Sequence, residues 1–382
     1  MSKPHPYIPN SAPETKQEML RQIGAASIEA FFDDIPESIR RNSTLQLPPS
    51  KPEMDARREV ESILSTNRST GEIVSFLGGG VWPHFVPAAV DEIVSRSEFL
   101  TSYTPYQAEI SQGMLQALFE YQSLIAELMG MDFANSSLYD WATALGEAAR
   151  MSSRVTKRDQ FVVPRYIQRD RLMTLRTFCE PAGISIVEAK QDSKTGSILE
   201  EDLLQKLGSG TAGVYLENPS YLGFLEPEAK RIGELAHEKG ALFVIGADPI
   251  SLGVFASPGE LGADIAVGEG QPLGNHMNYG GPLLGLFACK GDKLLRQMPG
   301  RLIGMTVTKD GSSKAFTMAL QTREQHIRRE KAASNICTNE ALCAVAAGAY
   351  LSLVGPRGIE KLGKAILANS HYAMRRLSEL KS

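Results

Sequence analysis

Residues 103–109 hold the densest set of polar side chains in the first half of the sequence. The set comprises Tyr103, Thr104, Tyr106, Gln107 and Glu109. Phenols, an amide and a carboxylate can surround a small polar ligand with hydrogen bonds, and a loop that leads into a helix holds such groups in place. The same residues could instead form a capped helix start in which Pro105 sets the turn. Both interpretations stay open on the residues alone.

Segment 321–331 carries an excess of positive charge. Its basic residues Arg323, Arg328, Arg329 and Lys331 outnumber Glu324 and Glu330, and His326 lies between them. Such a segment suits an anionic ligand or an acidic protein partner, although a solvated helix with internal ion pairs explains the same pattern. The following run at 334–339 is rich in side chains that bond to backbone, which indicates a specified turn and helix cap.

A glycine-rich loop at 268–282 follows a short apolar segment, where many α/β enzymes carry catalytic groups. The loop contains no lysine. It therefore cannot hold a carbonyl cofactor as a Schiff base, which requires a lysine amine. Gln271 lies within the loop, and a glutamine amide forms no imine.

Three consecutive glycines at 78–80 permit a left-handed backbone or close approach of a ligand. No Gly-Lys-Ser/Thr follows them, which excludes a Walker loop, and their spacing does not fit a dinucleotide-binding fingerprint. His84 follows shortly afterwards, and we expect it to be structural rather than a catalytic base.

The hydrophobic periodicity predicts which elements position these groups. Helices are expected at 14–32, 54–64, 109–130 and 226–239, and two more after residue 338 with a break at 355–358. Short apolar runs predict strands at 161–164, 184–187, 213–216, 241–245 and 264–267. Strands that alternate with helices are typical of a parallel sheet covered on both faces, so the fold class is α/β.

Composition narrows the class further. The chain has 382 residues, of which 42% are hydrophobic and 22% charged, so a packed globular protein is expected. A net charge of -4 gives no basic field for nucleic acid. Four widely spaced cysteines predict free thiols rather than disulfides or a metal site, and apolar stretches look too short to span a membrane. We therefore expect a cytoplasmic protein with no nucleic-acid or membrane partner.

Several motifs together resemble subunit 1 of the decarboxylating glycine dehydrogenase, the P-protein of the glycine cleavage system. The resemblance covers nearly the whole chain, and its most specific part is 322–339. The motifs are His-Pro-Tyr-Ile-Pro at 5–9, Asp-Asp-Ile-Pro at 33–36, Tyr-Thr-Pro-Tyr-Gln at 103–107 with Glu109 and Ser-Gln-Gly at 111–113, Tyr-Asp at 139–140, and 322–339.

The resemblance implies a pyridoxal phosphate (PLP) enzyme of the aspartate aminotransferase-like fold, fold type I. In that family a related second subunit supplies the cofactor lysine. Alignment on the shared Gly-Gly-Pro at 280–282 places that lysine at Gln271, and Asp248 falls near the aspartate that pairs with the pyridine nitrogen. Both residues would then belong to a degenerate cofactor site, and PLP would be bound covalently by the partner subunit rather than by this chain.

The expected domains are a helical N-terminal arm at 1–70, a large α/β domain at 71–335 and the helical start of a truncated C-terminal domain at 336–382. Two positions depart from the family pattern. Val-Trp-Pro-His at 81–84 stands where the family usually has a tyrosine-containing loop, and Trp141 stands where it usually has glycine.

These patterns together predict one subunit of a glycine decarboxylase that is inactive alone. Its expected partners are P-protein subunit 2, glycine, and the lipoylated H-protein, whose lipoyl arm receives the aminomethyl group. In this scheme the loop at 103–109 shapes a shared active site. Two alternatives remain: an independent PLP-dependent aminotransferase or decarboxylase that uses another lysine, with Lys290 as the candidate, and a structural or regulatory pseudoenzyme.

Overall fold

The computed structural model describes residues 4–41, 43–78 and 80–380. Contacts divide the chain into one unit that ends at Val74 and a second that begins at Ser75. The domain boundary expected after residue 70 lies close to this division. The described part of 336–382, which we assigned to a separate C-terminal domain, falls within the second unit.

The first unit contains two helices, α1 (Pro13–Gln22) and α2 (Glu53–Leu64), and short 3₁₀ turns at Pro9–Ser11 and Glu29–Phe32. The helix predicted over 14–32 is wrong in its second half, because Gly24 adopts a left-handed φ of 71° just after α1 ends. Neither α1 nor α2 has a buried residue. Apolar side chains such as Phe31 and Ile63 are therefore exposed in this unit.

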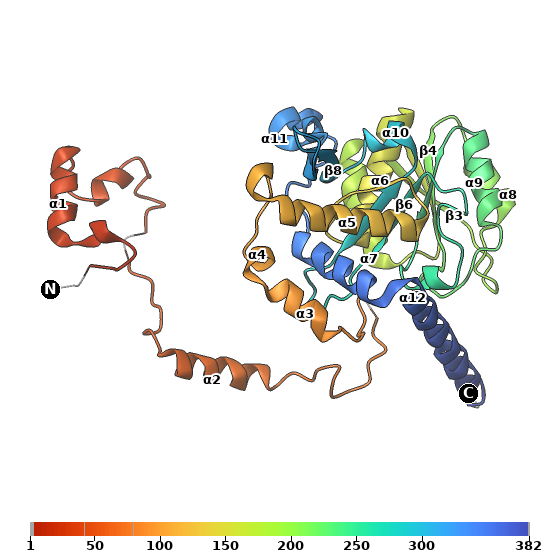
Figure 1. Ribbon diagram of the computed structural model, residues 1–382, viewed down its shortest axis with the longest axis horizontal. Helices are drawn as coiled ribbons and strands as arrows, with labels where there is room; N and C mark the ends of the chain where they lie inside the picture. Colours follow the sequence, from red (N-terminus) through yellow and green to blue (C-terminus); the bar gives the residue numbers. More distant parts are fainter. Residues whose placement is uncertain (1–3, 42, 79, 381–382) are drawn as a thin grey trace. The chain divides into compact units, whose positions relative to one another are not determined.

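A mixed sheet of seven strands forms the centre of the second unit (Figure 1). The strands are β1 (Phe133–Ala134), β2 (Gln160–Pro164), β3 (Ser185–Ala189), β4 (Thr211–Glu217), β5 (Leu242–Gly246), β6 (Ile265–Glu269) and β7 (Gly285–Cys289), in the spatial order β1-β7-β6-β5-β4-β2-β3. All five predicted strands are confirmed as β2 to β6, and they run parallel.

The expectation of a purely parallel sheet is wrong at one edge. Strand β7 pairs antiparallel with β6, and β1 pairs antiparallel with β7. The chain returns from β6 through the loop at 270–284 without a crossover helix, and strands joined in this way run in opposite directions. This loop is the glycine-rich segment identified in the sequence, and it begins at the carboxyl edge of the parallel strands.

Helices cover both faces of the sheet because the strand residues alternate between two apolar cores. Phe161 and Val163 face one core, which includes residues of α6 and α7. Val162, between them, faces the other core, which includes residues of α5, α8, α9 and α12. The helices of this unit are α3 (Ala88–Ser95), α4 (Ser97–Leu100), α5 (Gln112–Met129), α6 (Trp141–Thr156), α7 (Arg169–Cys179), α8 (Glu200–Lys206), α9 (Ala229–Glu238), α10 (Gly291–Leu295), α11 (Gln325–Arg328) and α12 (Ala341–Ser378).

Helix α12 contains the predicted break, since Gly355 has non-helical angles (φ 63°, ψ 175°). By length and composition this helix could cross a membrane, contrary to the expectation that no apolar stretch is long enough. Its first part packs against α3 and α5, where Ala344, Ala347 and Tyr350 are buried. Core packing thus accounts for the apolar character of that part.

A two-stranded hairpin, β8 (Leu302–Val307) and β9 (Lys314–Ala319), is attached to α5 by two glutamine side chains. The Gln122 amide accepts from the Ile303 N–H (2.9 Å) and donates to the Ile303 carbonyl (3.0 Å). Gln112 makes the same pair of bonds with Phe316, at 2.8 and 2.9 Å. Each side-chain amide satisfies a backbone N–H and a carbonyl that a neighbouring strand would otherwise bond, so α5 fixes the position of the hairpin.

Gln122→Leu should lower the free energy of unfolding by about 1–3 kcal/mol, because it leaves the buried N–H and carbonyl of Ile303 without partners. Urea unfolding followed by circular dichroism measures the change. Gln116→Leu, on the exposed face of the same helix, should shift stability by less than about 0.5 kcal/mol. Equal effects of the two substitutions would show that the amide does not anchor the hairpin.

Candidate functional site

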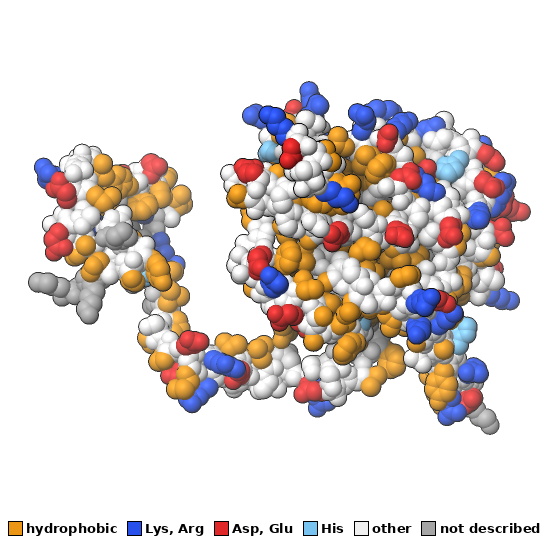
Figure 2. All heavy atoms as spheres, in the orientation of Figure 1, with side chains coloured by type: hydrophobic (Ala, Val, Ile, Leu, Met, Phe, Trp, Pro, Cys, Tyr) orange, Lys and Arg blue, Asp and Glu red, His pale blue; other side chains and the backbone are white. Residues whose placement is uncertain are grey.

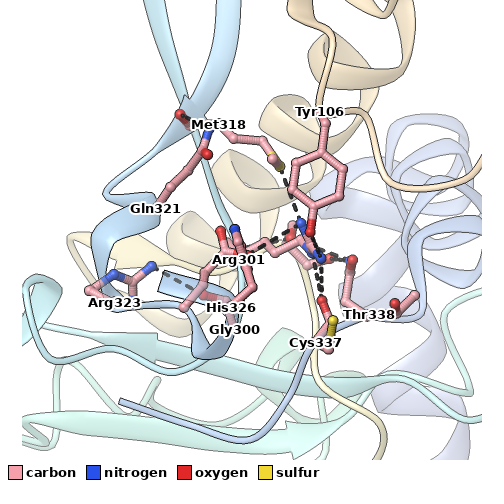
Figure 3. Close-up of polar contacts among 12 residues, drawn as sticks. Tyr106, Gly300, Arg301, Met318, Gln321, Arg323, His326, Cys337 and Thr338 are labelled. Atoms are coloured by element: carbon pink, nitrogen blue, oxygen red, sulfur yellow. Dashed lines mark hydrogen bonds and ion pairs between the residues drawn. The ribbon is translucent and has the colours of Figure 1, made fainter. Parts of the chain in front are cut away.

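Arg301 lies at the centre of a polar cluster that joins three segments far apart in the sequence (Figure 3). Its side chain is only 3% exposed. The guanidinium donates from Nε to the Cys337 carbonyl (2.9 Å), and Nη2 donates to the Tyr106 hydroxyl (3.0 Å) and again to the Cys337 carbonyl. Glu324 lies 3.6 Å from Nη1 and balances the charge. No motif or spacing in the sequence indicated Arg301, since only long-range packing makes it central.

The loop at 103–109 is one wall of this cluster. The Tyr106 ring lies beneath the Arg301 guanidinium, with 4.9 Å to the ring centre, and meets His326 edge to face. The Tyr103 hydroxyl lies 3.2 Å from the Thr338 hydroxyl. The structure therefore brings the two polar segments of the sequence analysis together, and Tyr103 and Tyr106 keep exposed surface.

Three other predicted residues of this loop are less engaged. Among the described residues, Thr104, Gln107 and Glu109 make no side-chain hydrogen bond or ion pair. Gln107 and Glu109 are exposed, and Glu109 lies in a 3₁₀ turn (Ala108–Ile110) directly before α5. Their amide and carboxylate are thus free of partners within the described residues, next to the ordered tyrosines.

Segment 321–331 does not form a single helix, so the alternative interpretation as a solvated helix with internal ion pairs is wrong. It consists of a 3₁₀ turn at Gln321–Arg323, the four-residue α11 and a second 3₁₀ turn at Arg329–Lys331. Arg323 turns inward and donates to the carbonyls of Gly300 and Leu320, and burial lowers the pKa of Arg323 to about 10. His326, Arg328 and Arg329 are exposed, and Figure 2 shows basic side chains gathered over α11.

The predicted degenerate cofactor site lies at the carboxyl ends of β4, β5 and β6, where open α/β sheets usually bind ligands. Gln271 is fully buried there. Its amide donates to the Asn275 carbonyl (2.8 Å) and lies 3.4 Å from His84 Nδ1, and its oxygen accepts from the Trp82 N–H at 3.4 Å. The chain's own segment 81–84 therefore covers the position assigned to the lysine. Of the glycines before it, Gly79 lies outside the described residues.

Asp248 follows β5 and is also turned into the protein. Its carboxylate accepts from the N–H groups of Ile250 (2.9 Å) and Ser251 (3.0 Å). Burial raises the pKa of Asp248, while these bonds and the nearby charge of Arg171 oppose the rise. Asp248 and Arg171 are therefore close enough to attract one another.

Arg171 and Trp141 fill the space between these strand ends. The guanidinium carbon of Arg171 lies 3.5 Å from the centre of the Trp141 ring, and its Nη1 donates to the buried Glu217 carboxylate at 2.8 Å. Trp141 Nε1 donates to the Tyr215 hydroxyl (3.1 Å). A Cβ at Gly246 would lie 2.8 Å from the indole, so only glycine fits beneath it. Sequence analysis missed this stack because its members are far apart in the chain.

Glu269, the last residue of β6, points its carboxyl group at the N-terminus of α6. Its carboxyl oxygens accept from the backbone N–H groups of Trp141 (3.2 Å), Gln271 (3.0 Å) and Leu284 (2.9 Å). A helix N-terminus with converging N–H groups is a usual binding place for phosphate. Here the protein supplies the acceptor itself, and burial raises the pKa of Glu269 to about 8.

Lys290 is wrong as an alternative cofactor lysine. It follows β7, and because β7 is antiparallel its end lies beside Ile265, the first residue of β6. Gln271 lies just beyond the other end of β6. The Lys290 ammonium also donates to the Gly259 carbonyl at 2.7 Å. Within the described residues, no group of three or more His, Cys, Asp or Glu side chains could hold a metal ion.

Comparison with known proteins identifies the family. Residues 5–382 match the model of the glycine cleavage system P-protein. The chain belongs to the glycine cleavage system P-protein family. A relative from Thermococcus kodakarensis, named as a probable glycine dehydrogenase (decarboxylating) subunit 1, is 53% identical over 98% of this chain and 82% of its own length. A second relative with this name, from Desulfitobacterium hafniense, is 46% identical over 98% of this chain and 82% of its own length.

Solved structures agree with the family and the fold. A crystal structure of an inhibitor-bound glycine decarboxylase (P-protein) is 42% identical, with a TM-score of 0.82 over 94% of this chain and 78% of that one. The sphingosine-1-phosphate lyase of Burkholderia pseudomallei shares the fold at 14% identity, with a TM-score of 0.57 over 87% of this chain and 75% of its own. The predicted PLP-dependent fold type I is thus confirmed.

The described residues do not fit PLP as a ligand of this chain. A glutamine stands at the lysine position, an indole and a guanidinium fill the space beside Asp248, and a carboxyl group occupies the helix N-terminus.

Substitution of Glu269 by glutamine should change how stability depends on pH. The folded pKa of about 8 lies above the ordinary value of 4.5, so the folded state holds this proton more tightly. The resulting stabilisation is complete below pH 4.5 and is lost as the pH rises towards 8. Glu269→Gln cannot lose a proton, so its stability relative to wild type should improve across that window.

Urea unfolding at intervals between these two pH values measures the difference. Glu201→Gln, at an exposed position of α8, should keep a constant difference from wild type. A parallel pH dependence for Glu269→Gln and wild type would contradict a buried, proton-binding Glu269.

Proposed function

We propose that this chain is the subunit of a glycine decarboxylase that lacks the cofactor lysine, and that its loop at 103–109 completes an active site whose PLP is held by P-protein subunit 2. The observation that carries the proposal is the polar cluster around Arg301, which orders exposed phenols at the surface of a chain whose own cofactor position is closed. Membership of the P-protein family and the name "subunit 1" of its relatives support a partner subunit.

The partner's cofactor would accept electrons as glycine loses carbon dioxide. The aminomethyl group would then pass to the lipoyl arm of the H-protein. This chain would bind and orient: Arg301 holds the Tyr106 ring and hydroxyl in place, and Thr338 contacts the hydroxyl of Tyr103. Thr104, Gln107 and Glu109 add polar groups beside them. We expect the enzyme to work in the cytoplasm.

The exposed basic side chains beside this loop suit an acidic or anionic partner. His326, Arg328 and Arg329 project from the segment that packs on Tyr106, while Arg323 is engaged inside the protein. Electrostatic attraction of this kind speeds association and orients a docking protein. We therefore assign these three residues to contacts with the H-protein or its lipoyl arm.

The contact with subunit 2 requires apolar surface. A groove of about 810 Å³ lies between α3, α5 and α12 and is lined by Val90, Ile93, Phe99, Met114 and Leu353 among others. Leu100 and Ile110 nearby in sequence are largely exposed. Obligate interfaces bury about 2,000 Å² or more and are more apolar than other interfaces. The helices before the sheet, within residues 13–130, are the expected contributors.

Tyr106→Phe and Glu109→Gln should each slow glycine decarboxylation by about 100-fold, the typical cost of losing one hydrogen bond that strengthens in the transition state. Glycine-dependent carboxyl exchange by the chain assembled with subunit 2 measures the effect. Neither change removes much volume, so assembly should remain intact by light scattering. Tyr372→Phe, on α12, and Glu201→Gln serve as matched controls.

Wild-type exchange by both variants in fully assembled enzyme would contradict the proposed role of the loop. The residues at 103–109 would then be a capped helix start, and the pseudoenzyme alternative would gain support.

A further inference from the structure

The strand ends where a fold type I enzyme would hold its cofactor are filled by this chain's own side chains. Four side chains of this protein take the places of parts of a bound aromatic phosphate. They supply a flat ring, a cation near an aspartate, a hydrogen-bond acceptor at a helix N-terminus and an amide at the lysine position. These side chains are Trp141, Arg171, Glu269 and Gln271.

The ring position is closed by packing. The Trp141 indole is 5% exposed, stacks on the Arg171 guanidinium and packs closely against Gly246. Its Nε1 is bonded to Tyr215, whose hydroxyl donates to the Glu217 carboxylate at 3.1 Å. A ligand ring at the end of β5 would have to displace the indole and break this buried chain of hydrogen bonds.

The phosphate position is closed by hydrogen bonding. The Glu269 carboxyl already accepts from the Trp141 N–H at the start of α6 and from the Gln271 and Leu284 N–H groups of the loop at 270–284. Glu269 is 2% exposed and is held by the turn from β6 into the loop at 270–284. A phosphate could accept from these N–H groups only if the Glu269 carboxyl group moved away from them. All five residues of β6, the strand that carries Glu269, are buried, so the strand offers this side chain no position that faces solvent.

We infer that Trp141 and Glu269 are permanent internal occupants of a former cofactor pocket, so that this chain binds no pyridoxal phosphate, either covalently or by non-covalent contact. Removal of both side chains should reopen a pocket for an aromatic phosphate. Loss of the indole frees the ring space and exposes the charge of Arg171, and loss of the carboxyl group frees three N–H donors. The inference concerns this chain alone and holds whether or not the loop at 103–109 acts on glycine.

Equilibrium dialysis of the full chain with pyridoxine 5′-phosphate tests the inference. This probe has the ring and phosphate but no aldehyde, so it cannot form imines with surface lysines. The wild-type chain and Trp141→Phe, which keeps an aromatic ring and Glu269, should show no saturable binding up to about 1 mM. The folded double variant Trp141→Gly/Glu269→Ser should bind about one equivalent at least ~10-fold more tightly, and inorganic phosphate should compete.

A second measurement does not depend on the double variant. The chain has two tryptophans, so Trp82→Phe leaves Trp141 as the only source of tryptophan emission. Its emission should not change with pyridoxine 5′-phosphate, because the ring neither moves nor meets the probe. Saturable binding of one equivalent by the wild-type chain with a change in Trp141 emission would overturn the inference. A folded double variant that binds no better than wild type would also overturn it. Neither result depends on carboxyl exchange, which tests the proposed function.

Discussion

The buried guanidinium of Arg301 is the constraint on which the candidate site depends. A buried cation is costly unless it is paired and hydrogen-bonded, and Arg301 meets that requirement only when three segments are in place. Tyr106 comes from the loop before α5, Glu324 from the turn after β9, and the Cys337 carbonyl from the run before α12. Loss of any one would leave the charge incompletely satisfied, so the polar surface is assembled as a unit.

The rest of the second unit supports that arrangement. The Gln112 and Gln122 amides fix the hairpin whose first strand begins directly after Arg301. Ser334 donates to Glu147 on α6 (2.6 Å), and Asn339 donates to the hydroxyl of Ser137 at 2.9 Å, which fastens the run at 334–339 to α6 and to the segment before it. The surface loops are thus held by side-chain bonds to regular elements rather than by strand pairing.

The strand ends and the cluster around Arg301 differ in how much of their polar surface is exposed. At the strand ends, Trp141, Arg171 and Glu269 are buried and mutually satisfied, which suits a closed and inert interior. Around Arg301 the buried charge instead supports partly exposed tyrosines and the exposed His326. A chain with this combination can shape a binding surface for a reaction, but it relies on another chain for the reactive carbonyl.

The sequence predicted the repeating part of the fold well because periodicity is a local signal. Strands β2 to β6, α2, α5 and the break at Gly355 follow directly from apolar spacing and glycine. The antiparallel direction of β7 does not follow from the sequence, because five apolar residues do not specify which strand they pair with. Tyr106 and Gln271 were found through motifs. Arg301, Arg171 and Glu269 instead act through hydrogen bonds to residues 195, 46 and 128 positions away, which a linear pattern does not show.

The central claim is that the cofactor lysine of the working enzyme belongs to the partner subunit. Borohydride reduction of the enzyme assembled from this chain and subunit 2 in the presence of PLP, followed by peptide mapping, tests it directly. We predict stoichiometric pyridoxyl-lysine in subunit 2 and none at a defined position of this chain. Stoichiometric labelling of Lys290, or of any other single lysine of this chain, would contradict the account.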